Sequence, residues 1–278
     1  MIIWLASYPK SGNTWVRLFI EALVFKKNKN LDLNNISIRQ FPLRSDFLKL
    51  NINPDNINEF ISNCVLCQDS INLDNSTKIF KTHNSMWKAG INSFTNDDNT
   101  KGVIHIMRDP RNIITSVKNH FSRETYDEAY KFMTNEKQSI GSKISKQDKD
   151  LPTVVSSWSN HYNSWKKMQK NYLLIKYENL LNDTKNEFNK IVEYLNLNLN
   201  LEFNNDDVQK AIDSCDFKNL KKIEKSGGFE ESAKDKSGNV KKFFYLGPNN
   251  DWRTLLDKKT INSLENIFKK EMIELGYL

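Results

Sequence analysis

Short apolar runs alternate along this chain with longer segments of helical periodicity. Four of the runs have the length and residue types of a strand, and apolar positions at helical spacing follow. Strands that alternate with helices predict an α/β fold in three layers: a mostly parallel central sheet with helices on both faces. The predicted strands are Ile2 to Leu5, Lys78 to His83, Lys101 to Met107 and Tyr172 to Tyr177.

Helical spacing of the apolar residues predicts the elements between and after these strands. The pattern is clear from Trp15 to Val24. Asp109 followed by Pro110 is typical of a helix N-cap with proline in the first turn, and apolar positions continue to Phe121. The other predicted helices are Glu59 to Leu66, Val154 to Met168, Leu180 to Leu195, a stretch from Asp206, and Leu255 to Leu275.

Three stretches carry few apolar anchors and are predicted to be mostly irregular. Residues 28–56 are rich in Asn and Leu and are interrupted by two prolines, which indicates loops with one short helix. Residues 123–150 are highly charged, as is typical of a surface excursion or lid. A polar segment with two adjacent glycines covers residues 227–240.

Length and composition fit a globular protein that binds anions. The 278 residues allow one α/β domain or two smaller ones, and since no repeat or low-complexity linker divides them, we expect a single domain, 1–278. The net charge of 41 − 34 = +7 is spread along the chain. It favours anionic partners without distinguishing nucleic acid, membrane surface or small phosphates.

The hydrophobic pattern of the sequence shows neither a transmembrane segment nor a signal peptide. No apolar run approaches the ~20 residues of a transmembrane helix. The first residues form the first predicted strand and lack the separate cationic and apolar regions of a signal peptide. We therefore expect a cytoplasmic protein in a reducing compartment.

The three cysteines cannot form a disulfide framework. Cys64 and Cys67 form a Cys-x-x-Cys pair, which is compatible with half a zinc site or a redox pair. No second pair, nearby histidine pair or thioredoxin-like context completes either site. The default interpretation is an ordinary helix or loop position, and no metal is predicted.

The turn after the first predicted strand has the features of an anion site. A strand, a glycine-containing turn and a helix leave backbone N–H groups and a helix N-terminus directed at one place, where phosphate binds well. Lys10 adds a positive charge, and Ser11, Asn13 and Thr14 add short donors beside Gly12. The turn is not a Walker A loop, because no glycine stands at the first position of G-x-x-x-x-G-K-[ST].

Polar residues follow every predicted strand. Ligands of open parallel sheets bind beyond the carboxyl ends of the strands. Lys10 follows the first strand, Lys81 and His83 close the second, Arg108 follows the third, and Tyr177 closes the fourth. Together they predict one functional site at this edge of the sheet.

The side chains at two of these positions, Arg108 and His83, could act chemically at this site. Arg108 and Ser116 stand eight residues apart, and the pair offers a planar fork and a small donor to a further phosphate group. Taken alone, they are better explained as a surface arginine and a helix serine. His83 carries an imidazole, whose ordinary pKa near ~6.5 leaves it neutral at pH 7.

The motifs together resemble those of the sulfotransferases that use 3′-phosphoadenosine 5′-phosphosulfate (PAPS). The octapeptide Tyr8-Pro-Lys-Ser-Gly-Asn-Thr-Trp15 is similar to the family's 5′-phosphosulfate loop, and Arg108-Asp-Pro-Arg-Asn-Ile-Ile-Thr-Ser116 resembles its 3′-phosphate motif. Lys81-Thr-His83 resembles the family's Lys-Thr-His. The likeness runs from residue 2 to the closing Leu275-Gly-Tyr277 and implies a P-loop-like fold.

The resemblance implies roles for individual residues. Lys10, Lys81 and His83 would be catalytic, with His83 as the general base and Lys81 assisting at the transferring sulfuryl group. The tyrosine of Ile-Lys-Tyr177-Glu-Asn would contact the cofactor. The cofactor-binding set implied by the motifs is Lys10, Ser11, Gly12, Asn13, Thr14, Trp15, Arg108, Ser116, Tyr177, Phe217, Leu220 and Gly247, although Phe217 and Leu220 also fit an ordinary core.

The chain departs from the family pattern near its C-terminus. Gly247-Pro-Asn-Asn-Asp-Trp252 resembles the family's glycine-x-x-glycine-Asp-Trp. Family members commonly carry Arg-Lys just before the first glycine, where both residues reach the 3′-phosphate, and here Tyr245-Leu246 replace them. Lys241 and Lys242 lie close by in the sequence and are candidate substitutes.

The resemblance therefore implies a PAPS-dependent sulfotransferase without a metal, acting on a hydroxyl or amine of a small-molecule or glycan acceptor, with no nucleic acid partner. Two alternatives remain open: a P-loop nucleotide kinase-like phosphotransferase, and a non-catalytic nucleotide-binding protein. The kinase would need Mg²⁺ ligands and a Walker A spacing, neither of which is found. The acceptor pocket is expected in the variable loops 28–56, 123–150 and 227–240.

Overall fold

The computed structural model describes residues 1–25, 31–141, 151–168, 171–235 and 237–278. It divides into two compact units, each assembled from three separate stretches of the chain. Unit 1 comprises Met1–Tyr8, Ile38–Ile106 and Asn135–Leu174, and unit 2 comprises Pro9–Ser37, Met107–Thr134 and Ile175–Leu278.

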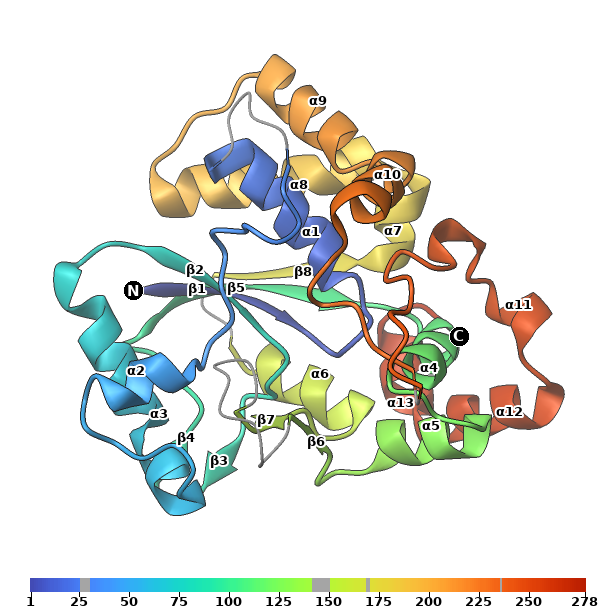
Figure 1. The fold of residues 1–278 in the computed structure, drawn as a ribbon, viewed down its shortest axis with the longest axis horizontal. Helices are drawn as coiled ribbons and strands as arrows, with labels where there is room; N and C mark the ends of the chain where they lie inside the picture. Colours follow the sequence, from blue (N-terminus) through green and yellow to red (C-terminus); the bar gives the residue numbers. More distant parts are fainter. Residues whose placement is uncertain (26–30, 142–150, 169–170, 236) are drawn as a thin grey trace. The chain divides into compact units, whose positions relative to one another are not determined.

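Unit 1 is organised on the sheet (Figure 1). The strand order is β2-β1-β5-β8, and β1 (Ile2–Ser7) pairs in parallel with both β2 (Lys78–Thr82) and β5 (Thr100–Met107). The predicted α/β class with a parallel sheet is thereby confirmed. The other elements are α2 (Arg44–Leu48), α3 (Ile57–Ile71), η2 (Asn72–Asp74), β3 (Lys88–Ala89), β4 (Asn92–Ser93), β6 (Ser139–Ile140), β7 (Thr153–Val154), α6 (Trp158–Lys166) and β8 (Tyr172–Lys176).

The sheet register aligns the carboxyl ends of the strands. Ala6 stands opposite Thr82, and Ser7 stands opposite Ile106. All six residues of β1 are buried, as expected for an inner strand of a parallel sheet. The residues that follow these three strands therefore leave the sheet at the same edge.

Trp4 is the centre of the apolar core of unit 1. Its ring centroid lies 5.6 Å from that of Phe41, 5.1 Å from that of Phe94 and 6.2 Å from that of Trp165. The indole N–H, which would otherwise be buried without a partner, donates to Thr100 Oγ1 at 3.0 Å. Segments distant in the sequence thus converge on the middle of β1.

Unit 2 is helical. In one part α9 packs against α1, α8 and α10, and in another α4 packs against α5, α11 and α12 (Figure 1). Phe19 and Phe188 stack with their centroids 3.9 Å apart and join α1 to α8. The elements are α1 (Asn13–Ile20), η1 (Glu21–Phe25), α4 (Pro110–His120), α5 (Tyr126–Thr134), α7 (Tyr177–Asn182), α8 (Thr184–Leu199), α9 (Asn205–Ser214), α10 (Phe217–Gly227), η4 (Gly247–Asn249), α11 (Trp252–Leu255), α12 (Lys258–Ile267) and α13 (Lys269–Glu274).

Three predicted helices have different limits, because local capping outweighs hydrophobic periodicity. The helix predicted from Val154 begins at Trp158, where the Ser157 side chain accepts the N–H of Asn160. The helix predicted over 180–195 divides at Asp183 into α7 and α8. The helix predicted over 255–275 corresponds to α12 and α13, and α11 ends at the first residue of the predicted range.

The charged stretch 123–150 contains more regular structure than its composition indicated. Helix α5 buries Ala129, Phe132 and Met133, and the Phe132 ring stacks on Phe121 with centroids 4.8 Å apart. Three well-spaced apolar residues are therefore enough to anchor this helix. Residues 142–150 of the predicted lid, like 28–30 of the first loop and 236 of the third, lie outside the described residues.

Candidate functional site

The anion loop of unit 2 is built on two residues with left-handed backbone. Lys10 has φ 70°, and Gly12, the N-cap of α1, has φ 104°. A Cβ on Gly12 would lie 2.5 Å from Cδ2 of Tyr177, so this close approach of a ring to the backbone requires glycine. The first N–H groups of α1 have no carbonyl one turn before them, as at any helix N-terminus. The predicted strand, turn and helix are all present.

Arg108 is held against this loop. Its Nη1 donates to the backbone oxygen of Lys10 at 3.2 Å, and its guanidinium carbon lies 4.1 Å from the ring centroid of Tyr177. The residue is only 6% exposed, and its Nε has no hydrogen-bond partner in the described part of the chain. A buried guanidinium with an unused donor is well suited to binding an anion.

Tyr177 connects the loop, the arginine and α1. Burial raises the pKa of its phenol, and the positive charge of Arg108 acts in the opposite direction. The ring also meets Trp15 edge-on, with centroids 5.9 Å apart. Tyr177 is the first residue of α7 and follows the end of β8, where the sequence had placed it as the last strand residue.

The remaining loop residues have distinct surroundings. Lys10 Nζ lies 4.2 Å from the ring centroid of Phe243. Ser11 is fully buried, and among the described residues no group pairs with its Oγ. Asn13 and Thr14 are also buried. The loop thus offers a cation and a buried hydroxyl beside a helix N-terminus.

Phe217 and Gly247 meet in unit 2. A Cβ on Gly247 would lie 2.2 Å from the ring of Phe217, and this glycine has φ 54°. Leu220, on the same helix as Phe217, is 1% exposed and belongs to the core. Three residues after Gly247, the side-chain amide of Asn250 donates to Ser116 Oγ at 3.2 Å. The loop 247–250 therefore connects the start of α10 with the second turn of α4.

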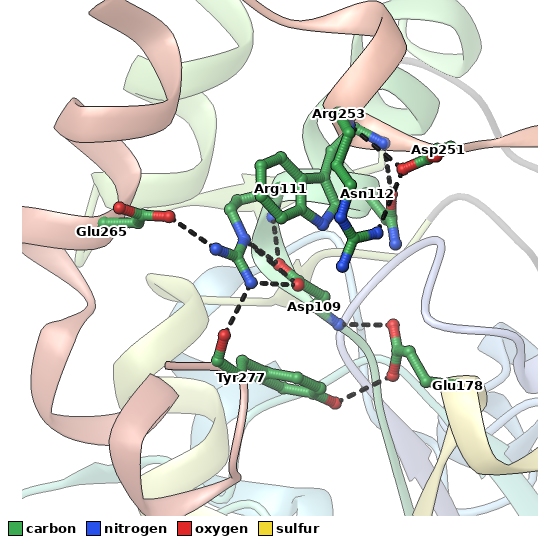
Figure 2. Close-up of polar contacts among 9 residues, drawn as sticks. Asp109, Arg111, Asn112, Glu178, Asp251, Arg253, Glu265 and Tyr277 are labelled. Atoms are coloured by element: carbon green, nitrogen blue, oxygen red, sulfur yellow. Dashed lines mark hydrogen bonds and ion pairs between the residues drawn. The ribbon is translucent and has the colours of Figure 1, made fainter. Parts of the chain in front are cut away.

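A network of charged groups fixes the start of α4, and of its members only the Asp109 cap was predicted (Figure 2). Asp109 caps the helix and pairs with Arg111, whose NH2 group also donates to the backbone oxygen of Tyr277 at 2.7 Å. Glu178 accepts the N–H of Asp109 at 2.9 Å and the hydroxyl of Tyr277 at 3.1 Å. Burial raises the pKa of the Glu178 carboxyl. Since Arg108 immediately precedes Asp109, the network also positions Arg108.

The predicted base belongs to unit 1. His83 Nδ1 lies 2.8 Å from the backbone oxygen of Ser7 and 3.2 Å from its Oγ. A carbonyl oxygen only accepts, so Nδ1 carries the proton and Nε2 of the neutral ring is the basic nitrogen. Lys81, near the end of β2, is 6% exposed. The tautomer of His83 is thus set by Ser7, the last residue of β1.

The other conspicuous side chains have structural surroundings. His105 and His161 are fully buried in unit 1. Cys64 and Cys67 lie on α3 as free, buried thiols, and burial raises the pKa of both, to about 12 for Cys67. Within the described ranges, no three His, Cys, Asp or Glu residues are grouped so as to hold a metal ion. None of the described helices is long and apolar enough to cross a membrane.

Comparison with known proteins agrees with the motifs. The family model described as "Sulfotransferase domain" matches residues 2–276. Cytosolic sulfotransferase 6 of Arabidopsis thaliana is 21% identical, over 99% of this chain and 79% of its own. The amine sulfotransferase of Oryctolagus cuniculus is 23% identical, over 97% of this chain and 80% of its own.

Solved structures share the fold. Mouse sulfotransferase SULT7A1 complexed with PAP superposes with a TM-score of 0.59 at 19% identity, covering 97% of this chain and 83% of its own. Retinol dehydratase in complex with androsterone and PAP superposes with a TM-score of 0.61 at 16% identity. The match covers 98% of this chain and 80% of the retinol dehydratase chain. With a family model that matches nearly the whole length, the chain belongs to the sulfotransferase domain family and is a PAPS-dependent sulfotransferase.

Proposed function

We propose that the loop 8–15, Arg108, Ser116 and Tyr177 bind the nucleotide of PAPS, and that His83 is the general base of transfer. The observation that carries this proposal is the position of Arg108, buried on Tyr177, bonded to the backbone of Lys10 and left with an unused Nε. This arrangement supplies positive charge and donors beside the N-terminus of α1.

The residues fit a nucleotide that carries two phosphate groups. The buried Ser11 Oγ and Arg108 Nε both lack partners among the described residues, and each is a donor that an anion would satisfy. Gly12 and Gly247 bring the backbone close to the aromatic rings of Tyr177 and Phe217. We assign the loop and Lys10 to the 5′-phosphosulfate, Arg108 and Ser116 to the 3′-phosphate, and Phe217 to the adenine, with Leu220 in the core on the same helix.

When bound, PAPS supplies the sulfuryl group and leaves as adenosine 3′,5′-bisphosphate. His83 Nε2 takes the proton of the acceptor hydroxyl or amine as the new bond to sulfur forms. Lys10 neutralises the charge that develops on the phosphate oxygen as its bond to sulfur breaks, and Lys81 assists at the sulfuryl oxygens. As in phosphoryl transfer, the protein contributes mainly positioning and electrostatic stabilisation.

The acceptor and the setting are part of the same proposal. We assign a small-molecule or glycan acceptor, a cytoplasmic location and one catalytic domain over residues 1–278. The names of the relatives, cytosolic and amine sulfotransferases, support the location and admit either an oxygen or a nitrogen acceptor. The loops that would select the acceptor are partly tied together in unit 2, where Asn34 accepts the N–H of Glu230 at 2.8 Å.

Thermal unfolding with nucleotides tests the proposal. Adenosine 3′,5′-bisphosphate should raise Tm in the presence of EDTA, because a ligand of the native state stabilises by RT ln(1 + [L]/Kd). Mg-ATP should have a much smaller effect. Arg108→Ala should remove most of the shift, whereas Arg253→Ala, the same charge change at a residue 69% exposed, should retain it. A larger stabilisation by Mg-ATP that EDTA abolishes would instead identify a kinase-like protein.

A further inference from the structure

Asn250 occupies a position where the family pattern has glycine. In Gly247-Pro-Asn-Asn-Asp-Trp252, the second glycine of glycine-x-x-glycine-Asp-Trp is replaced by asparagine. Its side chain is buried, with the residue 6% exposed. The amide nitrogen donates to the backbone oxygen of Asn112 at 2.8 Å and to Ser116 Oγ at 3.2 Å. The substitution therefore reaches a residue that we assign to the 3′-phosphate.

The orientation of this amide follows from its partner. The backbone oxygen of Asn112 can only accept, so the amide nitrogen and not Oδ1 must face it. The Oδ1 atom is buried and has no hydrogen-bond partner among the described residues. Because an unsatisfied buried acceptor costs folding free energy, stability alone gives a weak reason for asparagine here.

The same amide changes what the Ser116 hydroxyl can do. A helical serine or threonine commonly donates its hydroxyl to the carbonyl four residues earlier. Ser62 does so to Asn58 at 2.7 Å, and Thr134 does so to Tyr130 at 3.0 Å. In the described structure Ser116 makes no such bond, and its Oγ receives the Asn250 amide instead.

The Asn112 carbonyl explains the difference. It has two lone pairs, of which helix geometry gives one to the N–H of Ser116, and the Asn250 amide takes the other. The Asn112 carbonyl therefore has no lone pair left for the Ser116 hydroxyl, whose own oxygen already accepts the Asn250 amide. The hydroxyl hydrogen is left to donate to a group outside the helix. Phosphate oxygens are acceptors, so a serine held in this state is set to donate to them.

We infer that Asn250 is a positioning residue for the 3′-phosphate, directing the Ser116 hydroxyl toward it; this rests on the proposed function, which assigns Ser116 to that group. The inference also bears on Tyr245 and Leu246, which replace the family's Arg-Lys. Without those two cations, recognition of the 3′-phosphate depends more on Arg108 and on a correctly directed Ser116.

The test is the ratio of two dissociation constants measured by calorimetry, that of 5′-AMP divided by that of adenosine 3′,5′-bisphosphate. Because the two nucleotides differ only by the 3′-phosphate, this ratio reports the contribution of that group to binding. A purely structural role of Asn250 would weaken the binding of both nucleotides equally. Ser116→Ala should lower the ratio roughly tenfold, the scale of one charge-assisted hydrogen bond. Asn250→Ala should lower it by roughly three- to tenfold. Asn249→Ala, its exposed neighbour, should leave the ratio unchanged.

The double variant separates positioning from direct binding. In the Ser116→Ala background, Asn250→Ala should lower the ratio no further, because Asn250 acts through the hydroxyl already removed. A second full loss in that background, or an equal loss of both nucleotides in the single variant, would overturn the inference. If neither Ser116→Ala nor Arg108→Ala changes the ratio, the proposed 3′-phosphate site is itself wrong. Asn250→Gly, which restores the family residue, supplies the same comparison should Asn250→Ala fold poorly.

Discussion

The backbone oxygen of Ser7 fixes the tautomer of His83, the residue that we propose as the general base. The histidine Nδ1 lies 2.8 Å from the Ser7 carbonyl, which leaves Nε2 as the basic nitrogen. Arg108 shows the same dependence in unit 2, where the backbone oxygen of Lys10 and the ring of Tyr177 fix its guanidinium. In both units a backbone carbonyl beside the loop orients a side chain that we assign to the reaction.

Two buried histidines should make stability depend on pH. Burial lowers the pKa of His105 and His161, to about 3 for His161, and for His105 the neighbouring His161 adds to the effect. In the unfolded chain both titrate near ~6.5, so below that pH the unfolded state binds more protons. Their stabilising contribution is therefore present above about pH 6.5 and is lost as the pH falls toward the folded pKa.

Urea unfolding between pH 7.5 and 4.5 measures this effect. Each buried histidine adds a slope of up to about 1.4 kcal/mol per pH unit to the unfolding free energy. His161→Phe keeps a buried ring without the titrating group and should flatten the dependence by up to that amount. An unchanged slope in the variant would show that His161 does not titrate as a buried neutral group.

The replacement of Arg-Lys by Tyr245-Leu246 can be reversed. Tyr245 is 55% exposed, so a longer polar side chain costs little packing there. Tyr245→Arg with Leu246→Lys should tighten adenosine 3′,5′-bisphosphate by up to roughly tenfold per well-aligned contact and leave 5′-AMP nearly unchanged. Calorimetry at two salt concentrations should also show a steeper salt dependence.

Two results would argue against this view of the loop. Equal tightening of both nucleotides, or of neither, would mean that residues 245 and 246 do not face the 3′-phosphate. Selective weakening of the bisphosphate by Lys241→Ala with Lys242→Ala would identify those lysines as substitutes. Lys241 Nζ already donates to the backbone oxygen of Asn119 at 2.8 Å, which favours an anchoring role.

At the scale of elements, the loop before α1 depends on Gly12 for both conformation and packing. Gly12→Ala would combine a left-handed backbone with a Cβ placed 2.5 Å from the Tyr177 ring. We expect a loss of about 1–3 kcal/mol in stability and weaker binding of 5′-AMP and the bisphosphate alike. Gly90→Ala is the matched control, because Gly90 has φ +64° and nothing within 4 Å of the added Cβ. Equal nucleotide affinity in the two variants would contradict the role of Gly12.

The elements differ in how far the sequence predicted them. The strands around Trp4, Phe80 and Val103 were predictable, because buried parallel strands read as continuous apolar runs. Helix ends were less so: Ser157 and Asp183 stop or start helices through side-chain bonds that periodicity ignores. Helix α5 was missed because three apolar residues in a charged stretch suffice once other side chains cover them.

The candidate site, like the helix ends, was predicted only in part from the sequence. Motif spacing predicted Lys10, His83 and Arg108 as site residues, and each follows closely after a strand. Their supporting contacts join residues far apart in the chain: Glu178 bonds Asp109, and Asn250 bonds Ser116 across 134 positions. The one sign of the Asn250–Ser116 bond in the sequence is that asparagine stands where the family pattern has glycine.

At the scale of the whole molecule, the two units share strands. Strand β5 begins in unit 1 and ends with Met107 in unit 2, and β8 crosses from Leu174 to Ile175. Since each unit also needs three separate stretches of chain, neither is expected to fold alone. We therefore predict one cooperative unfolding transition, consistent with the proposed single domain.

Two probes check this prediction in one variant. Of the six tryptophans, Trp15 and Trp252 lie in unit 2 and the other four in unit 1. Fluorescence of the Trp15→Phe, Trp252→Phe double variant therefore reports unit 1, while far-UV circular dichroism reports both units. The two urea transitions should coincide. Separate midpoints would instead indicate two independently stable domains.

The most direct test of the whole account is transfer of labelled sulfuryl from PAPS with EDTA present, after a panel has identified an acceptor. The native protein should label that acceptor. Lys10→Ala and His83→Ala should each lower turnover by ~10²-fold or more, the usual effect of losing a charge partner or a general base. His83→Ala should still bind adenosine 3′,5′-bisphosphate as the native protein does. Near-native turnover of His83→Ala would contradict the account, because His83 would then not be the base.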